Sequence, residues 1–186
     1  MIYLLPIGEI DLSILLRLKR SLKIAFEGYN INVDIYPEEI QLDNFNYDVE
    51  REQYHASKIL KKISKIFREK LFFRILGVID KDIYTKNYNF IFGIANPIRR
   101  LALISITRLR ENFYKKSGLI HRTPKSKNEF DIRVFKESIH ELGHTSGLEH
   151  CFNSCVMNFS NSLADTDNKP VNFCLSCSSK LNIDED

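Results

Sequence analysis

The spacing of three histidines constrains the fold of this chain more than any other feature of its sequence. The segment from His140 to His150 reads H-E-L-G-H-T-S-G-L-E-H. Residues four apart lie on one face of a helix, about one turn from each other, so His140 and His144 can reach one ion if this segment is helical. Imidazole nitrogens bind zinc at about 2.0–2.1 Å, which this spacing allows. The sequence therefore predicts a helix that holds a metal ion, with zinc as the best candidate.

The third histidine requires the helix to end. Six residues beyond His144, a continued helix would have turned by about 600° and risen by about 9 Å, so His150 would point away from the metal. Gly147 is the expected turn, because glycine enters left-handed conformations without the penalty of a Cβ atom. Three histidines leave a fourth position open for water, which is typical of a catalytic rather than a structural site.

Glu141 is displaced by about 100° around the helix axis from His140. It cannot easily become a third ligand, but its carboxylate can reach a water molecule on the metal. We therefore interpret Glu141 as a general base. The alternative is a helix whose histidines are only surface or core residues. The added spacing of Gly147 and His150 disfavours that alternative.

All four cysteines of the chain follow this motif, in a C-x3-C pair and a C-x2-C pair. Each pair can present two thiolates to one ion, which predicts a structural zinc site. Residues 158–172, between the pairs, are mostly polar, so a metal would supply order that packing cannot. Two disulfides or a redox-active C-x-x-C are the alternatives, although this C-x-x-C does not follow a strand into a helix. The four residues are Cys151, Cys155, Cys174 and Cys177.

Composition sets the class and the compartment. The 186 residues, with 44% hydrophobic and 27% charged side chains, suit one soluble globular domain. The net charge of +3 does not by itself indicate a nucleic-acid partner. The start of the chain lacks the basic region of a signal peptide, and no apolar run reaches the ~18 residues of a membrane helix. We expect a cytoplasmic protein. A reducing compartment favours metal binding over disulfides, although hyperthermophile cytoplasm tolerates them.

Hydrophobic periodicity predicts strands that interleave with helices, and hence an α/β or α+β fold around one mixed sheet. Leucines and a phenylalanine recur at helical spacing before Gly28, a lysine-rich segment carries an isoleucine stripe, and the histidine helix has an apolar face that includes Ile132. We expect loops at 38–49 and 115–128, and no regular pattern beyond Gly147. The expected strands are 2–7, 31–36, 72–79, 87–93 and 101–107, and the expected helices are 11–27, 50–69 and 129–146.

The lysine-rich helix has two interpretations. Its basic residues could form a nucleic-acid or anion patch, but they more simply form a solvated helix face. The two histidines outside the motif, His55 and His121, are isolated, and we expect both to be structural. The basic residues are Lys58, Lys61, Lys62, Lys65 and Arg68.

The segment from His140 to Cys177 resembles the archaemetzincins, a metzincin family of zinc peptidases. The zinc motif is followed directly by Cys151, then by Cys155-Val156-Met157, then by the distal Cys174-x-x-Cys177. The loop between the first two cysteines and the segment from Met157 to Cys174 are each one residue shorter than the family pattern. The length of the chain suits the archaeal members, so the resemblance extends to the whole chain.

This resemblance implies a metzincin-like zincin with a twisted mixed sheet, a zinc-binding helix and a short irregular C-terminal subdomain held by the four-cysteine zinc. Residues 1–186 would form one catalytic domain, with an upper subdomain at 1–147, a lower one at 148–186 and the active-site cleft between them. Met157 would be the Met-turn residue beneath the histidines, rather than a gap-filling core methionine. Substrate would pair with the edge strand of the sheet, for which 87–93 is the best candidate and an interior strand the alternative.

The functional prediction is a zinc-dependent metallopeptidase with two zinc ions per chain, one catalytic and one structural. It would hydrolyse peptide bonds of a peptide or protein substrate through a zinc-bound water, with Glu141 as the base. We expect a monomer, with no membrane and no nucleic-acid partner. One alternative is a protein that kept this fold to bind a partner but has little or no peptidase turnover. Another is a nucleic-acid module that uses the cysteine site and the lysine-rich helix.

Overall fold

A five-stranded mixed sheet forms the centre of the molecule in the computed structural model, which describes residues 1–69, 74–115 and 127–181. The strand order is β2-β1-β5-β8-β7. The first four strands are parallel, and β7 runs antiparallel to β8 at one edge. This confirms the mixed α/β class. The strands are β1 (Ile2–Ile7), β2 (Val33–Ile35), β5 (Arg74–Ile79), β7 (Gly93–Asn96) and β8 (Leu101–Ser105).

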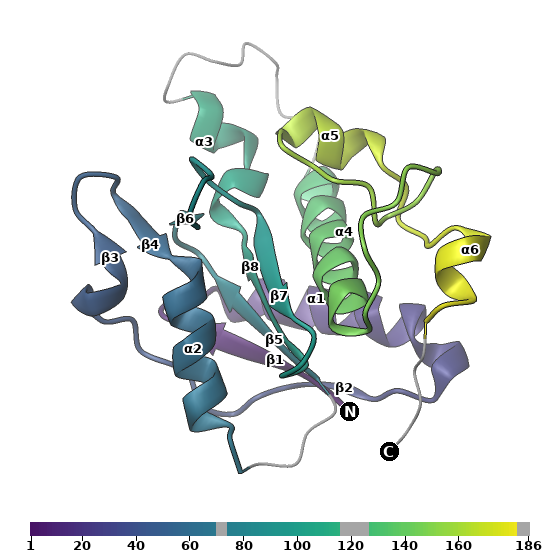
Figure 1. Cartoon of the computed structure of the whole chain (residues 1–186), viewed down its shortest axis with the longest axis horizontal. Helices are drawn as coiled ribbons and strands as arrows, with labels where there is room; N and C mark the ends of the chain where they lie inside the picture. Colours follow the sequence, from purple (N-terminus) through teal and green to yellow (C-terminus); the bar gives the residue numbers. More distant parts are fainter. Residues whose placement is uncertain (70–73, 116–126, 182–186) are drawn as a thin grey trace.

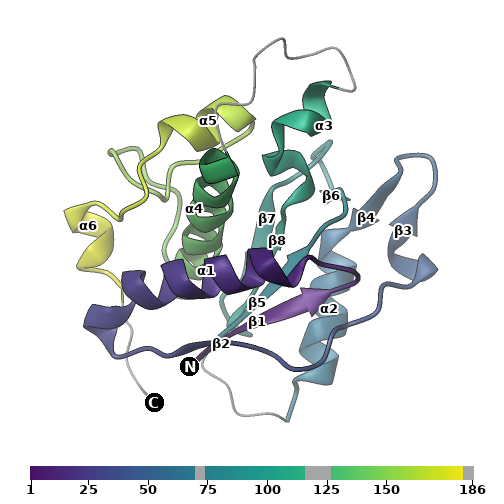
Figure 2. The same ribbon diagram turned by 180° about the vertical axis from the view of Figure 1, so that it is seen from behind.

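Helices cover both faces of this sheet, as Figures 1 and 2 show. Helices α1 (Leu12–Ala25) and α4 (Lys127–Thr145) pack on one face, and α2 (Ala56–Ile66) packs on the other. Alternate residues of a strand point to opposite faces, so β8 sends Ala102 and Ile104 toward α4. Its residues Leu101 and Leu103 point toward α2. A sheet that is buried on both sides explains why its strands read as continuous apolar runs.

Helix α1 begins after Asp11, whose side chain accepts a hydrogen bond from the Ser13 N–H at 2.9 Å. Its buried face consists of Ile14, Leu15, Leu18 and Leu22. Leu12 and Leu16 belong to the same run of apolar residues at helical spacing, but they are 56% and 49% exposed. Both positions lie one turn apart on the solvent side of the helix, so their apolar character did not reveal their orientation.

A second, three-stranded sheet was not predicted. It consists of β3 (Tyr47–Asp48), β4 (Gln53–His55) and β6 (Ile83–Tyr84), in the order β3-β4-β6. The expected helix at 50–69 therefore starts later, at Ala56, because the first residues pair as a strand. The expected loop at 38–49 contains β3 and a 3-10 turn. The short helices are η1 (Glu27–Tyr29), η2 (Asn44–Asn46), η3 (Thr107–Leu109) and α3 (Glu111–Lys115).

The edge strand lies later in the chain than predicted. Residues 87–92 form a turn and an irregular segment, and pairing with β8 begins only at Gly93. Asn87 adopts a φ of 72° and the Tyr88 N–H donates to the Thr85 carbonyl, so the chain turns here instead of extending. Phe92 is buried just before β7, and its carbonyl accepts a hydrogen bond from the Ser105 N–H of β8 at 2.8 Å. The prediction of a strand at 87–93 was therefore wrong except at its last residue.

The C-terminal segment contains two short helices, α5 (Leu163–Asn168) and α6 (Leu175–Ser178), where no regular pattern was expected. Ser162 caps α5 by accepting a hydrogen bond from the Asp165 N–H. Cys155, Val156 and Met157 are fully buried and belong to the same core as the sheet. Figure 1 shows this segment lying alongside α4.

The basic side chains of α2 have local partners that support the structural interpretation. Lys58 donates to the Phe45 carbonyl, and Lys62 donates to the Gln41 carbonyl and pairs with Asp43. They thus fasten the segment before β3 onto the helix. His55 packs against Tyr84 with ring centroids 5.0 Å apart, and His121 lies outside the described residues. No helix within the described ranges is long and apolar enough to cross a membrane.

Candidate active site

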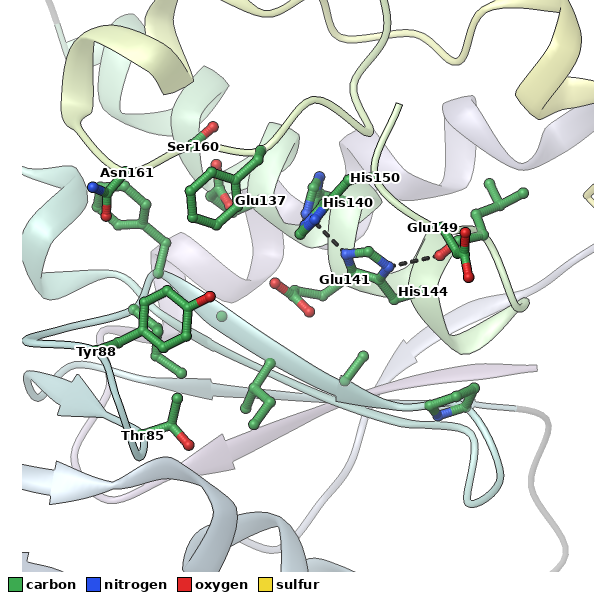
Figure 3. A pocket seen from close by; sticks show the side chains of 18 of the residues that line it. Thr85, Tyr88, Glu137, His140, Glu141, His144, Glu149, His150, Ser160 and Asn161 are labelled. Atoms are coloured by element: carbon green, nitrogen blue, oxygen red, sulfur yellow. Dashed lines mark hydrogen bonds between the residues drawn. The ribbon is translucent and has the colours of Figure 1, made fainter. Parts of the chain in front are cut away.

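Helix α4 positions three of the predicted site residues. It packs against β7 and β8, and its last two turns carry His140, Glu141 and His144 toward a cleft (Figure 3). The rings of His140 and His144 are 4.6 Å apart between centroids, as their spacing along one helix face requires. His140 and Glu141 are each only 4% exposed, so both are buried beneath the cleft surface.

The end of α4 returns the third histidine to the other two. Gly147 has a φ of 83°, in the left-handed region. Its N–H donates to the His144 carbonyl at 3.0 Å, and the Leu148 N–H donates to the Gly143 carbonyl at 3.2 Å. This pair of bonds is a Schellman motif, which ends a helix and reverses the chain. The ring of His150 consequently lies 5.3 Å from that of His140 and 4.9 Å from that of His144.

Backbone hydrogen bonds orient the imidazoles of His140 and His144 so that their Nε2 atoms face each other. His140 Nδ1 lies 2.9 Å from the Val156 carbonyl oxygen, and His144 Nδ1 lies 2.7 Å from that of Leu148. A carbonyl only accepts, so each Nδ1 carries the proton and each Nε2 has a bare lone pair. The two Nε2 atoms are 3.0 Å apart. Lone pairs this close repel unless a cation lies between them, and such fixed imidazoles are typical of metal ligands.

The three histidines offer ligand atoms that all lie within 4.8 Å of one another. Burial is the main cause that lowers the pKa of His140, His144 and His150, and the positive charge of Lys169 lowers each pKa further. A lowered pKa keeps the imidazole neutral, which is the form that binds a metal. The donor set and its protonation therefore fit zinc.

Glu141 lies between the histidines and the edge strand. A Cβ atom built on Gly93 of β7 would lie 2.6 Å from Glu141 Cγ and Oε1, so only glycine leaves room for this side chain. Glu141 Oε2 is buried and has no hydrogen-bond partner among the described residues. Burial raises the pKa of Glu141 well above its usual value, and the neighbouring carboxylate of Glu137 raises it further. One carboxylate oxygen is thus free to accept a proton from a molecule in the cleft.

Met157 is fully buried directly behind α4. Its Sδ would lie 2.5 Å from a Cβ atom on Gly143, which explains why a glycine separates the two histidine turns. The carbonyl of the preceding residue, Val156, accepts the hydrogen bond from His140. The chain at Met157 therefore supports the histidines from below through both packing and hydrogen bonding.

The four cysteines form a second cluster, with sulfur atoms all within 4.8 Å of one another and no disulfide. The Sγ atoms of Cys151 and Cys174 are 3.8 Å apart. Thiolates bound to one tetrahedral zinc at about 2.3 Å lie about 3.8 Å apart, so this spacing fits the ion. A hydrogen bond from the Cys177 backbone N–H and one from the Asn153 side-chain amide lower the pKa of Cys174 to about 6. The lowered pKa favours the thiolate of Cys174, the form that a metal requires, whereas burial raises the pKa of Cys155 and Cys177.

A cleft of about 770 Å³ runs past the histidines. Its walls are the segment from Thr85 into β7, the helix α4 and the residues that follow Met157. Figure 3 shows the Tyr88 hydroxyl directed into this space from the side opposite Glu141. The ring of Phe159 lies 5.1 Å from that of His150 and borders the same space. The volume of this cleft lies within the range usual for ligand-binding sites.

Some residues at the site were missed by sequence reasoning. Glu137 lines the cleft, and its position four residues before Glu141 on one helix was a signal that could have found it. Gly93 and Lys169 carried no such signal, because each reaches the site only through the folding of a distant segment. The residues that the motif predicted, by contrast, all lie together.

Three clustered histidines at a cleft, on a helix that packs against a mixed sheet with an antiparallel edge strand, are typical of zinc metallopeptidases. Comparison with known proteins narrows this class. The model of peptidase family M54 matches residues 9–183. The chain therefore belongs to peptidase family M54.

Curated relatives and solved structures agree with this family. The archaemetzincin of Pyrococcus furiosus is 39% identical over 183 residues, which cover 97% of this chain and 92% of that protein. That of Methanocaldococcus jannaschii is 40% identical over 177 residues, covering 95% and 89%. The crystal structure of Archaeoglobus fulgidus archaemetzincin, complexed with malonate, superposes with a TM-score of 0.77 at 35% identity, covering 97% of this chain and 99% of that one. A zinc-dependent peptidase from Methanocorpusculum labreanum gives 0.82 at 26% identity, covering 98% and 100%.

Proposed function

We propose that His140, His144 and His150 hold the catalytic zinc, and that Glu141 is the general base for peptide-bond hydrolysis. The observation that carries this proposal is a pair of bare Nε2 atoms 3.0 Å apart, in a cleft that is also lined by Glu141, one of whose oxygens has no partner in the described part of the chain. Two of the three imidazoles are already oriented by backbone carbonyls, so little rearrangement is needed to bind an ion.

When bound, zinc supplies a Lewis acid that polarises the scissile carbonyl and makes water more acidic. Glu141 accepts a proton from the water whose oxygen bonds to the carbonyl carbon. It then delivers that proton to the amine nitrogen as the carbon–nitrogen bond breaks, leaving a carboxylate and an amine as products. Gly93 allows the Glu141 carboxylate to lie against the edge strand, where the scissile bond would be held.

The substrate chain is expected to pair with β7, not with residues 87–92. β8 occupies one side of β7, and the other side borders the cleft. An extended peptide can add there as a further strand. This arrangement supports the division into an upper subdomain at 1–147 and a lower one at 148–186, because the cleft wall opposite β7 comes from residues after Met157.

The cysteine cluster supports a second, structural zinc ion held by Cys151, Cys155, Cys174 and Cys177. Thiolates that hold a metal persist in a reducing compartment, and we propose the cytoplasm. Both clusters are complete within one chain, which supports a monomer. Peptides or proteins are the proposed substrates.

Glu141→Ala tests the mechanism. The variant should keep the zinc content of the native protein and lose about 10²–10⁴-fold in peptidase turnover, as expected for a missing general base. Glu149→Ala is the matched control, since Glu149 lines the same cleft but is exposed. Cleavage of a peptide library and metal analysis provide the measurement. Equal turnover by Glu141→Ala and native protein would refute the mechanism. A zinc-loaded native chain that cleaves nothing but retains a partner would favour the binding protein.

A further inference from the structure

A buried ion pair beside the catalytic cluster has no part in the mechanism proposed so far. Lys169 Nζ lies 2.8 Å from Glu137 Oε1, and the two side chains are 2% and 3% exposed. Glu137 belongs to α4, and Lys169 directly follows α5 in the C-terminal segment. Burying two opposite charges is costly, so a pair at this depth calls for a physical reason.

Glu137 is positioned where it could interfere with the site. It precedes His140 by three residues and Glu141 by four, so the three side chains are neighbours on one helix surface. It also lines the cleft, and Figure 3 shows it beside the histidines. A free carboxylate at this position could turn toward the histidine nitrogens and bind the metal at the position left open for water.

The C-terminal segment holds one oxygen of Glu137 in two ways. Thr166 Oγ1 donates to Glu137 Oε1 at 3.2 Å, and Lys169 approaches the same oxygen. Thr166 is fully buried, so water does not compete for this contact. Both partners lie on the α5 side, which fixes the direction of the carboxylate.

The packing of α5 against α4 does not require the ion pair between Lys169 and Glu137. Arg133 pairs with Asp167, with Nε and Oδ1 2.5 Å apart. Lys136 donates to the carbonyls of Thr166 and Asp167 at 3.0 and 2.8 Å. These contacts join the same two helices, and neither Arg133 nor Lys136 lines the cleft.

We propose that Lys169 and Thr166 are positioning residues that hold the Glu137 carboxylate toward α5, so that Glu141 rather than Glu137 faces the metal and the substrate. This inference rests on the proposed function. It is supported by geometry, since the Lys169 ammonium lies 2.8 Å from Glu137 Oε1 in a buried contact. The same oxygen accepts the hydrogen bond from Thr166 Oγ1, so both contacts hold the carboxylate on the α5 side.

The test uses the full chain with zinc in the cysteine cluster and cobalt(II) loaded into the histidine cluster. Lys169→Met should change the visible cobalt spectrum, because the released Glu137 carboxylate approaches the ion. Its kcat should fall at least about tenfold with KM nearly unchanged, since Glu141 loses its position as base. Adding Glu137→Gln to Lys169→Met should restore both the native spectrum and most of kcat.

Lys136→Met is the matched control, because it weakens the same helix contact without touching Glu137. It should leave the cobalt spectrum unchanged, whereas a purely structural role predicts the same effect for both lysines. The proposal fails if Lys169→Met has the native spectrum, or if the double variant is no closer to native than the single one.

Thr166→Val replaces Lys169→Met if the latter does not fold. It removes one of the two contacts and should shift the cobalt spectrum in the same direction by a smaller amount, again reversed by Glu137→Gln. A native spectrum for Thr166→Val would then overturn the proposal. The spectrum reports ligand geometry without turnover, so it decides the question even if the native chain cleaves no peptide.

Discussion

Two glycines set how closely the active-site helix approaches its surroundings. Gly93 leaves space for the side chain of Glu141, and Gly143 leaves space for the sulfur of Met157. Neither has a positive φ, so both positions call for glycine because of close packing and not because of backbone conformation. The positions of Glu141, the proposed general base, and of Met157 therefore both depend on glycines that leave room for them.

Gly93→Ala should reduce peptidase activity about a hundredfold, because displacing a catalytic group by about 1 Å has an effect of this size. The added methyl group would lie 2.6 Å from Glu141 Cγ, so the carboxylate must move. Zinc content should stay native, since the histidines are untouched. Gly28→Ala, where nothing lies within 4 Å of a new Cβ atom, is the control. Full activity of Gly93→Ala would show that Glu141 has another route to its position.

At the scale of the element, the turn that ends α4 positions site residues just as its helical turns do. The Schellman motif at Gly147 places Leu148 where its carbonyl accepts from His144. The same turn determines where His150 lies. Loss of this turn would therefore disturb the orientation of one histidine and the position of another.

Gly147→Ala should lower the free energy of unfolding by about 1–2 kcal/mol, the cost of a left-handed conformation for a residue with a Cβ atom. Nothing lies within 4 Å of the added atom, so the loss is a backbone effect. Urea denaturation measures it. Gly147→Asn should lose less, because asparagine tolerates this conformation. Equal losses for both substitutions would point to a cause other than backbone conformation.

Long periodic elements were predictable, and short ones were not. The helices at α1, α2 and α4 follow from apolar spacing over several turns, whereas α5 and α6 are too short for a period to emerge. Residues 87–92 resemble a strand because aromatic residues favour strands, but the chain turns at Asn87 and pairs with β8 only from Gly93. Leu12 and Leu16 show that an apolar residue does not by itself reveal which side of a helix is buried.

Some residues of the candidate site could likewise be predicted from the sequence, and others could not. The histidines, Glu141 and Gly147 lie within one short segment, so helical geometry alone predicts that they meet. Lys169 contacts Glu137 only because the C-terminal segment folds back along α4. The two residues are far apart in the sequence, so their spacing does not indicate this contact. Spacing predicts neighbours within an element and fails for contacts that tertiary packing creates.

At the scale of the molecule, the C-terminal segment shares its core with the sheet. Val156, Met157 and Cys177 are buried in the same cluster as Leu4 and Leu76. The cysteine cluster is therefore part of the main hydrophobic core, because Cys155 and Cys177 are buried in it.

Cys174→Ser should reduce the zinc content, measured in zinc excess, from about two ions per chain to about one. The midpoint of thermal unfolding should fall by several degrees, because bound metal stabilises the folded state. Ser176→Ala, at an exposed position of the same short helix, is the control. Unchanged zinc content in Cys174→Ser would exclude the four-cysteine site.

His150 and Cys151 are consecutive residues, yet one belongs to the histidine cluster and the other to the cysteine cluster. An ion bound by either residue limits the conformations of the backbone between them. It therefore also holds the other residue near the position in which that residue binds its own ion. Such coupling is reciprocal, because each ion must raise the affinity for the other by the same factor. We therefore expect the two zinc ions to bind cooperatively. Under zinc limitation, a population of this protein would then consist mainly of chains with both ions and chains with none.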